Sequence, residues 1–205
     1  MFKRLKDRNF RKPVGLMGRY IIRFLRKNQP EYDELEPLLN LNKDDVILEI
    51  GYGLGQGIYD FAGKYDCSFH GIDFSRLMYS KARKLNREFI RQGKVVLHCA
   101  DFDGYAFQPE SYHCIYFLNV IYFWKETGSR LKKIYSLLKP GGKVIIFMAD
   151  AVIFKDIQPA KGKPIFFLHS VGEVVKEMEK TGFTAVEIME HSLEKNCFYI
   201  IGHKE

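Results

Sequence analysis

The sequence predicts an α/β fold built on a doubly wound, mostly parallel, seven-stranded sheet. Short apolar runs alternate with segments of helical periodicity, which is typical of a parallel sheet covered by helices. A glycine-rich loop follows the first run, and a short polar connection joins the last two runs. Because so short a connection joins adjacent antiparallel strands, we expect the chain to end in an antiparallel hairpin. The expected strands are 46–50, 68–73, 95–99, 111–119, 143–148, 184–190 and 197–202.

Helices are expected between these strands, where apolar residues recur at helical spacing. Ser75 is a good N-cap for a long helix, and Gly93 and Gly182 end the helices that precede them. The Lys-Pro-Gly-Gly sequence at 139–142 predicts a tight turn before the fifth strand. The expected helices are 31–39, 57–65, 76–92, 128–138 and 169–181.

The composition favours one globular domain over residues 1–205, because 46% of the residues are hydrophobic and 15% are aromatic. The four cysteines are scattered and form no Cys-x-x-Cys pair, which argues against a zinc site or any other metal centre. Reduced thiols in a cytoplasmic protein are the preferred interpretation. No apolar run approaches the roughly 18 residues that span a bilayer.

The positive charge is concentrated at the amino end. The net charge is +7, yet residues 1–30 alone carry +9, so the remainder is slightly acidic. We divide the chain into a basic arm (1–14), a helical lid (15–40) and a core (41–205). Residues 15–28 have the pattern of a basic amphipathic helix, for which packing on the domain is the preferred interpretation. Peripheral membrane contact through residues 1–28 and contact with nucleic-acid phosphates remain open.

The glycine-rich loop reads Glu49-x-Gly51-x-Gly53-x-Gly55. Dinucleotide-binding loops use Gly-x-Gly-x-x-Gly, with the third glycine packing helix against strand. Here Gln56 or Ile58 stands at the third position in the two registers, so the dinucleotide pattern fails. A carboxylate at the end of the strand suits a cationic ligand better than a pyrophosphate.

This loop resembles that of the class I S-adenosylmethionine-dependent methyltransferases of the type 11-like group, which have a Rossmann-like fold. The turn and strand at 138–147, Leu-Lys-Pro-Gly-Gly-Lys-Val-Ile-Ile-Phe, is similar to the corresponding segment of that family. The resemblance covers roughly residues 12–204. It implies S-adenosylmethionine as the cofactor, S-adenosylhomocysteine as the product, and an amino-terminal segment that covers the cofactor.

Polar residues follow the expected strands at the edge where ligands bind in open parallel sheets. Asp73, 22 residues after Gly51, can accept both hydroxyls of a ribose. Asp101 can accept the exocyclic amine of adenine, and Asn119 can meet the amino-acid part of the ligand. Each has a structural alternative: a helix cap for Asp73, a turn acid for Asp101 and an Asx turn for Asn119. The predicted cofactor-binding residues are Glu49, Gly51, Tyr52, Gly53, Gly55, Asp73, Phe74, Met78, Asp101, Phe102 and Asn119, with Met78 and Phe102 on either side of the adenine.

The segment after the fourth strand, 119–124, reads Asn-Val-Ile-Tyr-Phe-Trp and faces the predicted methyl group. It lacks the Asn-Pro-Pro-Tyr sequence of enzymes that methylate exocyclic amines of nucleobases or glutamine. Its aromatic residues indicate a pocket for a small acceptor, with packing against the next helix as the alternative for Phe123 and Trp124. A general base is needed only if the acceptor loses a proton, and the weak candidates are His169, Tyr20 and Tyr122.

The sequence therefore predicts a cytoplasmic enzyme that methylates a small molecule. The alternatives are an RNA or tRNA methyltransferase that uses the basic arm, and a non-catalytic S-adenosylmethionine-binding protein. The sequence does not specify the acceptor, the methylated atom or the oligomeric state.

Overall fold

The computed structural model describes residues 30–154 and 167–205. The predicted basic arm (1–14), most of the predicted lid, Tyr20 and the loop at 155–166 lie outside the described residues. Within the described part, no helix is both long and apolar enough to cross a bilayer. Its four cysteines are free thiols.

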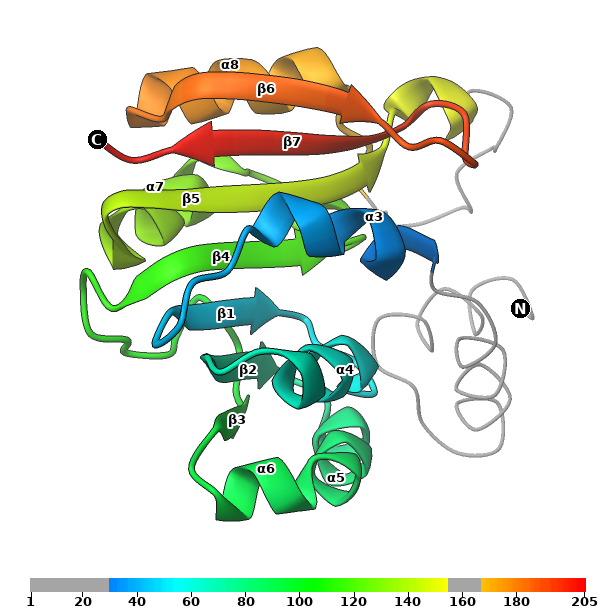
Figure 1. The fold of residues 1–205 in the computed structure, drawn as a ribbon. Helices are drawn as coiled ribbons and strands as arrows, with labels where there is room; N and C mark the ends of the chain where they lie inside the picture. The colour runs from blue at the N-terminus through cyan, green and yellow to red at the C-terminus, as the bar shows by residue number, and fades with distance from the viewer. Residues whose placement is uncertain (1–29, 155–166) are drawn as a thin grey trace.

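In the described part of the chain, seven strands form one sheet in the order β3-β2-β1-β4-β5-β7-β6 (Figure 1). The strands from β3 to β5 are parallel, whereas β7 runs antiparallel to both β5 and β6. The predicted doubly wound sheet and its terminal hairpin are confirmed. The bounds are β1 (Val46–Ile50), β2 (Ser68–Asp73), β3 (Val95–Cys99), β4 (Tyr112–Leu118), β5 (Leu138–Ala149), β6 (Thr184–Glu190) and β7 (Cys197–His203).

Helices cover both faces of the sheet. Figure 1 shows α3 and α4 in front of the strands, with α7 and α8 behind them. The two short 3₁₀ helices, Ile121–Phe123 and Ala151–Phe154, follow β4 and β5. The α-helices are α3 (Pro30–Leu39), α4 (Gln56–Lys64), α5 (Arg76–Leu85), α6 (Arg87–Arg91), α7 (Gly128–Leu137) and α8 (Val171–Thr181).

The predicted long helix over 76–92 is broken at Asn86. This side chain is fully buried, and its Nδ2 donates hydrogen bonds to the carbonyls of Gly55 and Ala82, both at 3.0 Å. A short polar side chain that bonds to the backbone competes with the helical hydrogen-bond ladder. The side chain that interrupts the helix therefore links the end of α5 to the glycine loop.

Two other boundaries differ from the sequence prediction. Residues 139–142, expected as a turn, form the start of β5, because Leu138 pairs with Tyr112 before a register shift in β4. The helix expected from 169 begins at Val171, because Ser170 is the N-cap of a capping box with Glu173. His169 therefore precedes α8.

The central strands are buried on both faces. Ile47, Leu48, Ile115 and Ile145 are all fully inaccessible, which explains why these strands read as continuous apolar runs. The connections from β1 and β4 leave toward opposite faces of the sheet. The strand order therefore reverses between β1 and β4, and in open α/β sheets a ligand-binding crevice forms at this point.

Candidate functional site

A cavity of about 280 Å³ lies at this reversal, at the carboxyl ends of β1, β2 and β4. The glycine loop forms one side of the cavity, the residues after β2 and β3 form a second, and the segment after β4 closes it. Most of the predicted cofactor-binding residues line it: Gly51, Gly53, Asp73, Phe74, Met78, Asp101, Phe102 and Asn119. The structure thus brings these predicted residues together around one cavity.

The glycines of the loop have different surroundings. Gly53 lines the cavity with a φ of +53°, and a Cβ added there would meet no atom within 4 Å. Gly55 lies away from the cavity, and a Cβ there would lie 2.7 Å from the Cβ of Ala82 on α5. A backbone without side chains therefore faces the cavity at Gly53, whereas Gly55 permits close packing of the loop on α5.

Asp73 is the most buried carboxylate that lines the cavity. Its Oδ2 accepts the N–H of Gly53 at 3.1 Å, and its Oδ1 accepts the N–H of Ser75 at 2.8 Å. Burial raises the pKa of Asp73 to about 6, and the two backbone hydrogen bonds oppose that rise. Each oxygen keeps a lone pair for a further donor, so this side chain can accept two hydroxyl groups from a ligand.

Apolar side chains form part of the cavity wall. Met78 and Phe102 are both almost fully buried, and both line the cavity. The ring of Phe102 stacks on that of Trp124, with centroids 6.3 Å apart and planes at 19°. Trp124 also lines the cavity. It therefore both packs against neighbouring side chains and forms part of the pocket wall, the two roles that the sequence left as alternatives.

Asp101 and Asn119 lie at the exposed rim. The Oδ1 of Asp101 accepts the N–H of Asp103 at 2.9 Å, which is the turn geometry considered as its structural alternative. Asn119 has a φ of +57° directly after β4. Both residues line the cavity. Their local turn geometry is therefore compatible with contact to a ligand.

Glu49 and Tyr52 lie behind the cavity wall. Glu49 is 2% exposed, and its two oxygens accept the phenol O–H groups of Tyr32 at 2.6 Å and Tyr116 at 2.9 Å. Burial raises the pKa of Glu49 to about 7 against the effect of these hydrogen bonds. The hydroxyl of Tyr52 donates to the carbonyl of His98 at 3.1 Å. Glu49, Tyr52 and Gly55 do not line the cavity, and ligand contact by each of the predicted cofactor-binding residues stays a prediction.

The charged groups that line the cavity are mostly acidic. Among the described residues, the lining includes three carboxylates, Asp73, Asp101 and Asp103, and one cation, Arg130. Arg130 is paired with Asp103 and donates to the carbonyl of Glu126. This set disfavours a pyrophosphate and accommodates a ligand that is neutral or cationic. Arg130, in the first turn of α7, was not predicted from sequence, because its approach to the cavity depends on how α7 packs after β4.

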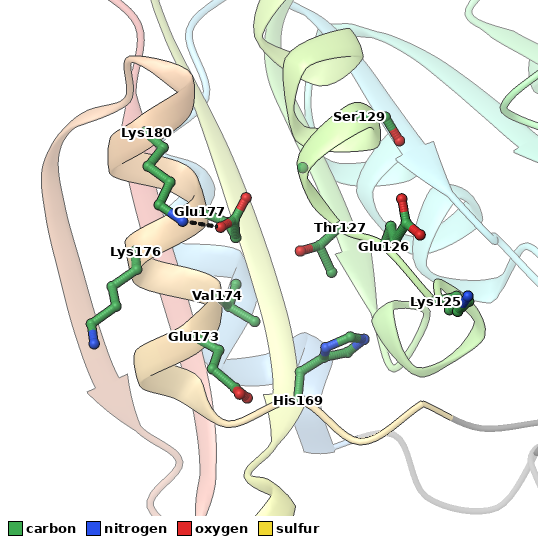
Figure 2. Close-up of a pocket in the computed structure, with 11 residues that line it drawn as sticks. Lys125, Glu126, Thr127, Ser129, His169, Glu173, Val174, Lys176, Glu177 and Lys180 are labelled. Atoms are coloured by element: carbon green, nitrogen blue, oxygen red, sulfur yellow. Dashed lines mark hydrogen bonds and ion pairs between the residues drawn. The ribbon is translucent and has the colours of Figure 1, made fainter.

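A larger cavity, of about 510 Å³, lies between the start of α7 and one side of α8 (Figure 2). Its charges are mixed, with lysines and glutamates from both sides. His169 lines it, and the Nε2 of His169 lies 2.8 Å from the carbonyl oxygen of Trp124. Trp124 therefore lies between the two cavities: its side chain lines the first, and its carbonyl bonds to a residue of the second.

Tyr122, the other described base candidate, lines neither cavity. Its hydroxyl donates to the carbonyl of Ala149 and accepts the N–H of the same residue. Burial raises the pKa of Tyr122 well above its usual range. Burial outweighs the N–H of Ala149, which by itself favours the phenolate, so Tyr122 is a poor base and His169 is the stronger of the two described candidates.

Residues 47–142 match a family model described as a methyltransferase domain. The chain is 30% identical over 146 residues to phosphoethanolamine N-methyltransferase 2 of Caenorhabditis elegans, covering 69% of this chain but 33% of that enzyme. It is 28% identical to an uncharacterized methyltransferase, YdaC, of Bacillus subtilis, covering 73% of this chain and 77% of that protein.

Among solved structures, the fold is similar to a Haemonchus contortus phosphoethanolamine N-methyltransferase 2 that holds S-adenosyl-L-methionine. The TM-score is 0.70 at 19% identity, and the match covers 85% of this chain and 52% of that one. This chain thus spans about a third to a half of the length of the two nematode proteins.

Proposed function

The chain belongs to the class I S-adenosylmethionine-dependent methyltransferases, and we propose that it transfers a methyl group from S-adenosylmethionine to a small-molecule acceptor. The observation that carries the proposal is the cavity at the carboxyl ends of β1, β2 and β4, which combines the carboxylate of Asp73 with an aromatic wall and the glycine backbone at Gly51 and Gly53.

The residues of this cavity suit that cofactor. Asp73 accepts the two ribose hydroxyls through its remaining lone pairs, and Met78 and Phe102 hold the adenine between them. Asp101 accepts the exocyclic amine with its second oxygen. Gly51, Gly53 and Asn119 meet the amino-acid part.

The bound cofactor would supply a methyl group already activated on a sulfonium. The protein's own contribution is then to position the acceptor and to exclude water. The carboxylates of the cavity favour the cationic cofactor over its neutral-sulfur product, which assists release of S-adenosylhomocysteine.

An amine of the phosphoethanolamine type is the first acceptor to test, because several curated relatives bear that activity in their names. An ammonium must lose its proton before its nitrogen can attack, so such an acceptor needs a base. His169 fits this role, because donation from Nε2 to Trp124 leaves Nδ1 of the neutral ring as a proton acceptor.

The test has two stages. Calorimetry with S-adenosylhomocysteine should give micromolar binding, and no binding by the intact protein at any pH would refute the proposal. Product formation is then measured with phosphoethanolamine and with ethanolamine, which lacks the phosphate. Turnover of the first alone supports a phosphorylated amine acceptor, and turnover of both supports recognition of the amine.

A nucleic-acid acceptor is the second candidate, because residues 1–30 carry a charge of +9. Bulk tRNA is therefore included as a substrate in the same assay. Methylation that weakens steeply with salt and disappears when residues 1–14 are removed would favour it. Binding without turnover of any acceptor would favour a non-catalytic protein, and the predicted cytoplasmic location awaits its own test.

A further inference from the structure

One side chain links α3 to the residues on either side of the glycine loop. Tyr32 donates its phenol O–H to the Oε1 of Glu49 at 2.6 Å, across 17 residues of sequence. Its ring also lies against Gly57 in the first turn of α4. A Cβ added at Gly57 would lie 2.0 Å from the Cε1 of Tyr32, so the tyrosine ring fills the space of a side chain at that position.

Glu49 has phenols on both sides. The second oxygen, Oε2, accepts the hydroxyl of Tyr116 on β4 at 2.9 Å. Among residues 30–154 and 167–205, the other charged groups that act on Glu49 and Tyr32 are acidic: Asp73 on β2, Glu31 on α3 and Asp60 on α4. Within this part of the chain, the phenol hydrogen bonds are therefore the interactions that favour the ionised carboxylate, and they lower its pKa while burial raises it.

Glu49 immediately precedes the part of β1 that reaches the cavity. Ile50 and Gly51 line the cavity, whereas Glu49 lies behind them with its side chain in the core. A negative charge there acts on a cationic ligand through a poorly screened interior. Whether that charge is present at neutral pH depends on how many phenols donate to it.

We infer that Tyr32 is a positioning residue for the cofactor: its hydroxyl keeps Glu49 ionised and its ring rests on Gly57, so the docking of α3 sets the affinity of the glycine loop for a cationic ligand. The inference rests on the proposed function, because it concerns the same cofactor site. It assigns to α3 a part in binding in addition to its cover of the sheet.

Tyr32→Phe tests the hydroxyl and keeps the ring against Gly57. In wild-type protein the affinity for S-adenosylhomocysteine, whose amino group is cationic, should fall as the pH is lowered through about 7. Loss of one donor raises the pKa of Glu49, so the midpoint of that fall should move to higher pH in the variant. A displacement of about one unit lowers the ionised fraction at pH 7 from about a half to about a tenth, which is about a fivefold loss of affinity.

The shape of the profile separates this role from a structural one. Near pH 8.5 the two proteins should bind almost equally, because Glu49 is then largely ionised in both. Asp73 also titrates, near pH 6, but it does so in both proteins and cancels in their ratio. A variant profile that is parallel to the wild-type profile at every pH would overturn the inference.

Tyr65→Phe is the matched control. The hydroxyl of Tyr65 donates to the Oε1 of Glu36 at 2.8 Å, so it joins α3 to the chain just after α4 without contacting Glu49. Loss of the Tyr65 hydroxyl should leave the pH midpoint of the affinity for S-adenosylhomocysteine unchanged. Tyr116→Phe removes the other donor to Glu49 and should displace the midpoint in the same direction as Tyr32→Phe.

A ligand-free measurement distinguishes failure of this inference from failure of the proposed function. The side-chain carboxyl resonance of Glu49, assigned with Glu49→Gln in carbon-13-labelled protein, reports the pKa of Glu49 directly. An unchanged pKa in Tyr32→Phe overturns the inference whatever the protein binds. A raised pKa in a protein that binds no S-adenosylhomocysteine at any pH refutes the proposed function, and with it the effect on affinity.

Discussion

Replacing Asp73 with Asn tests the proposed cofactor site with little change in side-chain shape. The carboxylate accepts the backbone N–H groups of Gly53 and Ser75 and has lone pairs left for two hydroxyls. An amide has one acceptor oxygen, so one of the two backbone N–H groups would face an NH₂ group. The variant therefore loses ligand hydrogen bonds and one hydrogen bond within the protein.

The loss of affinity can be estimated from these bonds. A hydrogen bond to a charged group contributes about 1.5–3 kcal/mol, and the amide retains part of one. A net loss of about 2–3 kcal/mol corresponds to a decrease in affinity of roughly 30- to 150-fold. The cost to folding should be smaller, because a neutral amide avoids the desolvation that raises the pKa of Asp73 to about 6.

Proton linkage gives the direction of this effect on folding stability. The pKa of Asp73 in the folded state lies above its usual value of 3.8, so ionisation of Asp73 reduces stability as the pH rises from about 4 to 6. At pH 7.5 the free energy of unfolding of the Asn variant should therefore lie within about 1 kcal/mol of the wild-type value, with the lost backbone hydrogen bond included.

The assay is calorimetric titration with S-adenosylhomocysteine at pH 7.5, together with urea unfolding of the free protein. Asp66→Asn is the control, because Asp66 is exposed just after α4 and pairs with Lys43 away from the cavity. Binding by Asp73→Asn within threefold of wild type would refute the assignment of the ribose to this carboxylate. Equal losses of affinity and stability would indicate a structural role.

Four further substitutions test other residues of the cavity, the candidate base and the support of the glycine loop. Phe102→Ala should weaken binding of S-adenosylhomocysteine about 5- to 30-fold by removing a stacking surface worth about 1–2 kcal/mol, measured by calorimetry. The Gly53→Ala variant should still fold, since no atom obstructs the new Cβ, but its free energy of unfolding should be about 1 kcal/mol lower because φ is +53°. The same variant should lose most of its affinity for S-adenosylhomocysteine in calorimetry. His169→Gln keeps a donor to the backbone carbonyl; if His169 is the base, kcat should fall at least 100-fold with little change in cofactor affinity, and an unchanged kcat would remove it as a candidate. Asn86→Ala should lower the free energy of unfolding by about 1–3 kcal/mol in urea titrations, because its buried amide holds the glycine-loop carbonyl.

The strands were predictable because their signal is local. Short apolar runs bounded by turns define buried parallel strands, and the bounds at 46–50, 68–73, 95–99 and 184–190 agree with those in the structure. The helix over 76–92 was predicted without its break, because the amide of Asn86 finds its partner in the glycine loop, 31 residues earlier. Helical periodicity contains no information about that distant carbonyl.

The candidate site was predictable to the extent that topology determines it. Once the strands are parallel, their carboxyl ends meet at one edge, and Asp73, Asp101 and Asn119 fall there together. Arg130 was missed because its approach to the cavity depends on how α7 packs after β4. The different surroundings of Gly53 and Gly55 were also not predictable, since the spacing of the glycines is the same on both sides.

Glu49 separates what the sequence determined from what the tertiary structure decided. The sequence alone placed an acidic residue at the end of the first strand, before a loop unsuited to a dinucleotide, and so indicated the class of cofactor. The structure decided that this carboxylate lies in the core between Tyr32 and Tyr116, which are 17 and 67 residues away along the chain. Motif spacing follows from backbone geometry, which is local. The ionisation of a buried carboxylate depends on the donors that folding brings to it from distant parts of the chain.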